Sequence, residues 1–269
     1  MGNRFEGKVA FITGAARGQG RAEAVKFASE GADIIALDAC KKFNSTPYEG
    51  ATEEDLAETV RLVEEQGRKI VATKADVRDF AAVTAALDAG IEAFGRLDAV
   101  VANAGICSAA LSWEITPEQW QETIDVNLTG AFYTCKAAIP KLIEQGEGGS
   151  IVLTSSVSSL KGAPFFGHYV ASKAGMAGLT RTMANELGMH RIRVNSVHPY
   201  GVATGMVMSD VLPLMERFAD TLAPAFMASI PDGFSTAEDV ANVVAFLSSD
   251  EAHHITGINM PIDLGNAAR

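Results

Sequence analysis

The chain has 269 residues, and its 33 acidic and 22 basic side chains give a formal net charge of −11 and a pI near 4.9. This length suits one α/β domain with a large core, and the acidic balance argues against a nucleic-acid partner. No apolar run reaches the length of a membrane span and the N-terminal stretch lacks a signal-peptide core, so we expect a cytoplasmic protein with no membrane partner. Three scattered cysteines indicate reduced thiols rather than disulfides or a metal site: Cys40, Cys107 and Cys135.

Residues 8–31 predict a strand, a glycine turn and a helix. Residues 9–12 are a continuous apolar run, typical of a strand buried on both faces, and residues 22–28 place apolar side chains at helical spacing. The turn between them contains Gly14, Gly18 and Gly20. Glycines let backbone N–H groups approach a phosphate, and the helix N-terminus adds partial positive charge. The spacing G-x-x-x-G-x-G differs from the pattern G-x-G-x-x-G, so a tight turn without a ligand is the alternative.

A second apolar strand, 33–38, ends in Asp38. An acidic residue about 20 residues beyond such a glycine turn binds the adenosine ribose hydroxyls of a dinucleotide. Its charge also repels a 2′-phosphate, so we expect NAD rather than NADP. Arg17, inside the turn, favours the opposite choice because it could pair with that phosphate. A solvated acid at a strand end is the simpler interpretation of Asp38.

The rest of the chain alternates predicted helices and strands after a long polar connection at 39–52. In order these are helix 52–66, strand 70–73, helix 81–94, strand 97–102, helix 116–144, strand 150–154, helix 168–187, strand 193–197, helix 236–248 and strand 257–262. Residues 201–235 are irregular or form short helices. The alternation predicts one α/β domain, 1–269, with a doubly wound parallel sheet of about seven strands and helices on both faces.

Parallel strands bring their carboxyl ends to one edge of the sheet, where ligands bind. Six residues that follow predicted strands are therefore expected to converge there: Gly14, Asp38, Asp76, Asn103, Ser156 and Pro199. The small residues Asn103, Ala104 and Gly105 form a turn that would let backbone lie close to a cofactor.

Tyr169 and Lys173 have i, i+4 spacing on the predicted 168–187 helix and therefore share one face. A lysine ammonium near a phenol favours the phenolate and lowers a pKa that starts near 10, so that the tyrosine can act as a general base for an alcohol, or as the acid in reverse. Ser156 precedes Tyr169 on the loop after a predicted strand, where its hydroxyl could hold the substrate oxygen. An ordinary tyrosine and a surface lysine are the alternative.

Taken together, these motifs resemble those of the classical short-chain dehydrogenase/reductase family over nearly the whole chain. The resemblance implies a Rossmann-like fold and a catalytic tetrad. In it Tyr169 is the acid/base, Lys173 lowers its pKa and binds the nicotinamide ribose, Ser156 positions the substrate oxygen, and Asn127 holds a water that links Lys173 to solvent. The implied cofactor-binding residues are Gly14, Arg17, Gly18, Gln19, Gly20, Asp38, Asp76, Val77, Asn103, Ala104, Gly105, Tyr169, Lys173, Pro199, Val202 and Thr204.

The chain departs from the family pattern at two positions. Ala102 stands where the family's turn usually has a first Asn, and Tyr200 separates the usual Pro-Gly pair after the sixth strand, while Thr204 still matches the position that binds the carboxamide. The insertion at 39–52 resembles the carveol-dehydrogenase-like branch. Members of that branch are thought to hold NAD tightly and to pass electrons to the carrier mycofactocin. The insertion could wrap the adenosine half of NAD, or it could be a plain surface loop.

We therefore expect an NAD-dependent oxidoreductase that interconverts an apolar, terpene-sized secondary alcohol and its ketone. A lid at about 203–235 would enclose the substrate, since this stretch is rich in apolar residues and Arg217 is its one basic residue. The same apolar side chains could instead serve as core. Two other functions stay open, an NADP-linked 3-oxoacyl reductase and a non-catalytic NAD-binding protein. The apolar circumference of helices 117–144 and 168–187, together with the resemblance, predicts a homotetramer.

Overall fold

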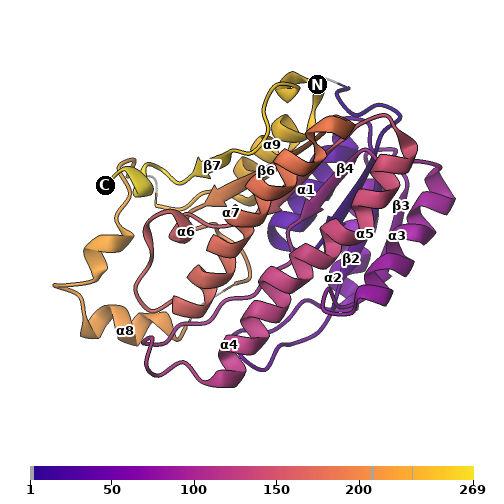
Figure 1. The fold of residues 1–269 in the computed structure, drawn as a ribbon. Coiled ribbons are helices and arrows are strands. Elements are labelled where there is room, and N and C mark those ends of the chain that lie inside the picture. The colour runs from indigo at the N-terminus through magenta and orange to yellow at the C-terminus, as the bar shows by residue number, and fades with distance from the viewer. Residues whose placement is uncertain (1–2, 207–208, 232) are drawn as a thin grey trace.

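Seven parallel strands form one sheet in the computed structural model, which describes residues 3–206, 209–231 and 233–269. The strand order is β3-β2-β1-β4-β5-β6-β7, so the chain builds outward from β1 in one direction, returns to β4, and builds outward in the other (Figure 1). This is the predicted doubly wound, Rossmann-like sheet. Its strands are β1 (Val9–Thr13), β2 (Asp33–Asp38), β3 (Ile70–Lys74), β4 (Ala99–Ala102), β5 (Gly149–Thr154), β6 (Ile192–Pro199) and β7 (Asn259–Ile262).

Helices cover both faces of this sheet (Figure 1). One face packs against α1 (Gly18–Ser29), α2 (Glu53–Glu64) and α9 (Ala237–Ser248), and the other against α3 (Phe80–Phe94), α5 (Gly130–Gln145) and α7 (Gly167–Leu187). Three further helices are α4 (Pro117–Ile124), α6 (Ser158–Lys161) and α8 (Val211–Arg217). Capping boxes begin α2 at Thr52 and α9 at Thr236, with Asp55 and Asp239 as their reciprocal partners.

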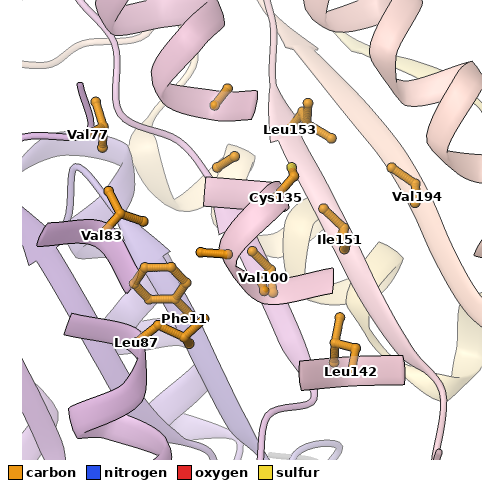
Figure 2. Packing of buried hydrophobic residues seen from close by; sticks show 14 of the residues in the cluster. Phe11, Val77, Val83, Leu87, Val100, Cys135, Leu142, Ile151, Leu153 and Val194 are labelled. Carbon is orange, nitrogen blue, oxygen red and sulfur yellow. The ribbon is translucent and has the colours of Figure 1, made fainter. Parts of the chain in front are cut away.

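Alternate residues of each strand enter the two halves of the core. Phe11, Val100 and Ile151 pack under α3 and α5, where Figure 2 shows them together with Leu87 and Leu142. The intervening strand residues face α1 and α9 instead, and this second cluster includes Ala10, Ile12, Val101, Val152, Phe27 and Val244. The central strands are therefore buried on both faces, as their continuous apolar runs predict.

Two predicted boundaries differ from the structure for identifiable reasons. The helix expected over 116–144 is interrupted by a π-helical turn at Asp125–Thr129, which joins α4 to α5 and contains Asn127. The strand expected from residue 97 begins at Ala99, because the side-chain amide of Gln145 bonds both the N–H and the carbonyl of Leu97 at 2.9 Å.

The lid (residues 203–235) contains α8 and a short 3₁₀ turn, Ala223–Phe226. Among the apolar lid residues noted in the sequence, Val207 and Met208 lie outside the described residues. The α8 helix and the C-terminus lie at the same end of the molecule (Figure 1). Within the described ranges, no helix combines the length and the apolar character needed to cross a bilayer.

Candidate active site

A cavity of about 690 Å³ opens at the carboxyl ends of the strands and extends under the lid. Most of the predicted site residues line it: Gly14, Arg17, Gly18, Gln19, Asp38, Val77, Asn103, Ala104, Gly105, Ser156, Tyr169, Lys173, Pro199, Val202 and Thr204. The lining does not include Gly20, Asp76 or Asn127. Each of them instead contacts a residue of the lining, namely Gly14, Lys41 and Ile106 respectively.

The glycine turn has the close backbone packing that a dinucleotide phosphate requires. Gly14 and Gly18 have positive φ angles of 70° and 57°. A Cβ atom on Gly20 would lie 2.2 Å from the carbonyl oxygen of Gly14. Asn103 donates from Nδ2 to the Thr13 carbonyl at 3.1 Å and so fixes the neighbouring loop against the turn. The side chain of Arg17, the N-cap residue of α1, makes no capping bond, so the first N–H groups of this helix are available to an anion, and the turn fits a dinucleotide.

Asp38 and Arg17, which predict opposite cofactors, are held in different ways. The Asp38 carboxylate accepts bonds from the backbone N–H groups of Ala16 (3.0 Å) and Cys40 (2.9 Å), which fixes it beside the glycine turn. Arg17 instead donates from Nη2 to the carbonyl of Glu49, at 2.6 Å, so its guanidinium is tied to the insertion. The geometry therefore favours Asp38 as the group that meets the ribose.

Asp76 is tied to the protein rather than directed into the cavity. It pairs with Lys41 at 2.6 Å and with Arg78 at 2.8 Å. Partial burial alone would raise the pKa of Asp76, but the bonds from Arg78 and Lys41 outweigh it and lower this pKa to about 2. Because Lys41 belongs to the insertion, Asp76 anchors the insertion to the sheet edge, and the adjacent Val77 is the residue that lines the cavity.

Ser156 is arranged as a hydrogen-bond donor. Its Oγ accepts bonds from the N–H of Ser158 at 3.2 Å and from the hydroxyl of Ser158 at 2.9 Å. Both lone pairs of the hydroxyl oxygen are then in use, so its own hydrogen is left to point toward a substrate oxygen. In the protein alone the Ser156 hydroxyl is close enough to Tyr169 to bond the phenol and lower its pKa, so a bound substrate oxygen would take over that bond.

Tyr169 and Lys173 lie together, but their protonation differs from the sequence expectation. Burial raises the pKa of Tyr169 and this outweighs the bond from Ser156, whereas Lys173 was expected to lower it. Burial also lowers the pKa of Lys173 to about 8. Lys173 Nζ donates to the Thr154 carbonyl at 2.6 Å and lies 5.7 Å from the centre of the Tyr169 ring. In the protein alone, desolvation therefore favours the neutral phenol over the phenolate.

Asn127 is buried, and its side chain bonds to the loop after β4 and to α7. Its Oδ1 accepts from the N–H of Ile106 at 2.8 Å, and its Nδ2 donates to the Ile106 carbonyl at 2.9 Å and to Ser172 Oγ at 3.1 Å. The polar residue within the helix is thus explained by the π-helical turn and these bonds. A role in holding a water near Lys173 rests on the family resemblance.

Several residues that line the cavity were not singled out from the sequence, among them Tyr48, Phe166 and Asn266. Tyr48 lies in the insertion and its hydroxyl accepts a bond from the N–H of Cys107 at 3.0 Å. An aromatic residue in an otherwise polar connection was a usable signal for Tyr48. Asn266 bonds only to backbone carbonyls of the lid through its side chain, and nothing in the sequence around it indicates that.

Comparison with known proteins decides which family has this geometry. A family model described as enoyl-(acyl carrier protein) reductase matches residues 14–267. The chain belongs to the short-chain dehydrogenase/reductase family. A curated member of this family, (-)-trans-carveol dehydrogenase from Rhodococcus erythropolis, is 43% identical over 99% of both chains.

Two solved structures of the family superpose closely on this chain. A short chain dehydrogenase from Mycobacterium paratuberculosis bound to NAD has a TM-score of 0.97 and 46% identity, covering 99% of this chain and 100% of the other. Carveol dehydrogenase from Mycobacterium avium in complex with NAD has a TM-score of 0.93 and 47% identity over 99% of each chain. The predicted fold and family are confirmed, and a carveol dehydrogenase is among the similar proteins.

Proposed function

We propose that this protein is an NAD-dependent oxidoreductase that interconverts an apolar secondary alcohol and its ketone. The observation that supports this best is the meeting of Ser156, Tyr169 and Lys173 in a cavity whose other end is lined by the glycine turn and Asp38. The NAD-bound relatives and the carveol dehydrogenases point to the same class of reaction. Bound NAD⁺ supplies the acceptor for the hydride that leaves the alcohol carbon.

The chain's own residues handle the proton and the substrate oxygen. Ser156 donates a hydrogen bond to that oxygen, because its lone pairs are occupied by Ser158. Tyr169 gives a proton to the oxygen during ketone reduction and takes it during alcohol oxidation. Lys173 is protonated below about pH 8, and its positive charge stabilises the phenolate during oxidation. A neutral Tyr169 is the form that burial favours, and this form is the acid needed for reduction.

NAD is the cofactor that the site fits. Asp38 lies where the adenosine ribose is bound in such folds, and Arg17, the residue that could favour NADP, is occupied by the carbonyl of Glu49. The insertion lines the cavity through Lys41, Phe43 and Tyr48, among others, so it would cover the bound cofactor. We infer from this that NAD exchanges slowly and is reoxidised in place by an external carrier such as mycofactocin.

The substrate is proposed to be apolar and about as large as a monocyclic terpene. Phe166, Phe226, Val211 and Met215 line the cavity under the lid. Arg217 is exposed and lies over the ring of Phe218, 5.0 Å from its centre, rather than in the lining. An acyl-carrier substrate or a carboxylate would lack a basic partner there, which separates this proposal from a 3-oxoacyl reductase.

Mass spectrometry of the co-purified cofactor, followed by an alcohol panel with and without an artificial electron acceptor, tests this function. The panel contains carveol, a steroid alcohol, 2-propanol and an acyl thioester. We expect NAD to co-purify and carveol to have the highest kcat/KM. Preference for 2-propanol, for the thioester or for NADP would contradict the proposal. Activity that needs the artificial acceptor would support the external carrier.

We also propose a homotetramer, formed through α4, α5 and α7. Trp120 and Phe132 are 45% and 38% exposed on the surface of α4 and α5, although Met176 and Met183 of α7 are buried within the chain itself. Exposed aromatic residues on adjoining helices favour an interface with a second copy. Light scattering at micromolar concentration tests this, and a stable monomer would refute it.

A further inference from the structure

The C-terminal tail, residues 263–269, is bonded to the second half of the lid at several points. The N–H groups of Ser229 and Ile230 both donate to the carbonyl of Leu264, at 2.9 and 3.0 Å. Leu264 and Gly265 have positive φ angles of 52° and 76°, so the tail makes a tight left-handed turn to reach the lid. The tail is therefore part of the structure that closes the cavity.

Asn266 is the central residue of this contact. It is only 2% exposed, and its Nδ2 donates to the lid carbonyls of Met227 at 2.8 Å and Ala225 at 3.4 Å. Its own carbonyl accepts a bond from Lys161 Nζ at 2.8 Å, and Lys161 ends α6, the short helix that follows Ser156. One side chain and one carbonyl thus connect the lid to the segment that holds the catalytic serine.

The two lid carbonyls that Asn266 holds flank Phe226, whose ring lines the cavity. This ring is stacked on Phe165, 6.2 Å between centres at 14°, and meets Phe166 edge-on at 6.2 Å. Phe166 in turn lies edge-on to Tyr169 at 6.4 Å. The carbonyl of Phe226 itself accepts a bond from the hydroxyl of Tyr200. An aromatic wall therefore runs from the catalytic tyrosine to the lid, and its outer ring is fixed through backbone bonds.

The first half of the lid is attached differently. There, the Asp210 carboxylate next to α8 accepts a bond from the N–H of Ala109 at 2.7 Å, and the side chains of α8 contact the cavity through Val211 and Met215. Exposed Leu212 lies in the same segment. The second half is held by the tail and by Tyr200, the residue that follows β6.

We propose that Asn266 is a positioning residue that sets the preference for bulky apolar alcohols, because it fixes the Phe226 ring as the far wall of the substrate site. This inference rests on the proposed function, since it concerns the same cavity. Asn266 acts through Phe226 and does not take part in proton transfer. Loss of its two N–H donors would release the 223–227 turn and weaken the contacts of one aromatic ring with the substrate.

The test replaces Asn266 by Asp, which keeps the size of the side chain but sets carboxylate oxygens against the two lid carbonyls. We expect kcat/KM for carveol relative to 2-propanol to fall about tenfold, mainly through a higher KM for carveol, as expected when one aromatic contact is lost. Phe226→Ala should have a similar effect, and the double variant should be little worse than either single variant. Gln145→Glu is the matched control, because it removes an equivalent amide-to-carbonyl bond on Leu97, at the opposite edge of the sheet.

Two further measurements separate this inference from the proposed function. Hydrogen exchange of the 223–230 amides should be faster in Asn266→Asp than in the wild type, and calorimetric binding of carveol to the NAD-loaded protein should weaken about tenfold. If the wild type turns over no alcohol of the panel, the proposed function fails, and the hydrogen exchange of the 223–230 amides still decides whether Asn266 fixes the wall, because unchanged exchange in Asn266→Asp would overturn the inference. An unchanged substrate ratio with unchanged carveol binding, or additive effects in the double variant, would overturn the inference.

Discussion

The two ends of the cavity are built from different material. The cofactor end is made largely of backbone, where Gly14 and Gly20 approach so closely that a single Cβ would lie 2.2 Å from a carbonyl oxygen. The substrate end is made of side chains from the lid and the tail, which meet across long stretches of sequence, as Asn266 meets Met227. Backbone packing permits few alternatives, whereas aromatic and methionine side chains repack readily. We therefore expect the cofactor end to accept fewer ligands than the substrate end.

Tyr169 lies where the two ends meet, and its replacement should have the largest effect. Tyr169→Phe removes the group that we propose exchanges a proton with the substrate oxygen, so turnover should fall by about a thousandfold or more, while NADH binding, measured by fluorescence titration, changes little. The control is Tyr133→Phe, since the Tyr133 ring packs on Phe80 in α3, outside the cavity lining. If Tyr169→Phe keeps about a tenth of the wild-type rate, the acid/base assignment is wrong.

Asp38 tests whether the cofactor end really admits one ligand. Asp38→Asn removes the charge that repels a 2′-phosphate and weakens bonds to the ribose, so the preference for NAD over NADP should narrow by about thirtyfold. The ratio of kcat/KM values for the two cofactors measures this, or the ratio of binding constants if bound NAD does not exchange. Asp33→Asn, at the other end of β2, is the control, because Asp33 bonds Arg68 and Lys69 at the sheet's opposite edge. A wild-type preference for NADP would show that Arg17 dominates instead.

The sequence predicted the cofactor end in more detail than the substrate end, and the reason is physical. Gly14, Asp38 and Asn103 act through turns and strand ends that are local in sequence, so their spacing alone indicates their roles. Tyr169 and Lys173 share a helix face for the same reason. Their protonation depends on burial by distant residues, which raises the pKa of Tyr169 in the protein without cofactor and which the spacing does not indicate.

Contacts between distant segments were beyond a sequence argument. The side chain of Asn266 bonds to backbone carbonyls of the lid. Every residue has such a carbonyl, so the residue types of the lid do not indicate where Asn266 binds. The π-helical turn at Asp125–Thr129 likewise depends on the loop after β4, to which Asn127 is bonded. Strand and helix positions were predicted well, because the periodicity of apolar residues in each segment indicates whether one or both of its faces are buried.

Glu23, on α1 behind the glycine turn, should make the stability of the folded chain depend on pH. Its carboxyl is fully buried without a hydrogen-bond partner among the described residues, and burial raises its pKa to about 8 from an ordinary 4.5. Between these two values the folded chain binds a proton that the unfolded chain releases. The free energy of unfolding should therefore fall as pH rises through this range, by up to about 1.4 kcal/mol per pH unit, and level off above the folded pKa.

Urea unfolding at pH 6, 7 and 8 measures this dependence. Glu23→Gln has no titrating carboxyl at this position, so its free energy of unfolding should not fall over this pH range. The stability of the variant relative to the wild type should therefore increase as pH rises. Glu64→Gln, an exposed position at the end of α2, should keep the wild-type slope. A wild-type stability that stays constant or increases from pH 6 to 8 would show that Glu23 is solvated or paired in solution.

Tyr48 decides to which end of the cavity the insertion belongs, with the smallest expected effect. Tyr48→Phe keeps the ring but removes the oxygen that accepts the bond from the Cys107 N–H, which is worth about 1 kcal/mol. If the insertion closes over the cofactor, opening it becomes easier and NADH release, followed by stopped-flow fluorescence, should accelerate about fivefold with little change in the KM for carveol. Tyr133→Phe again provides the matched control. A change in the KM for carveol without a change in NADH release would place Tyr48 at the substrate end, and no change in either would identify the insertion as a surface loop. Of these outcomes, only faster NADH release fits a cofactor that stays bound between turnovers. In that case the insertion, rather than the glycine turn, limits how fast NAD leaves.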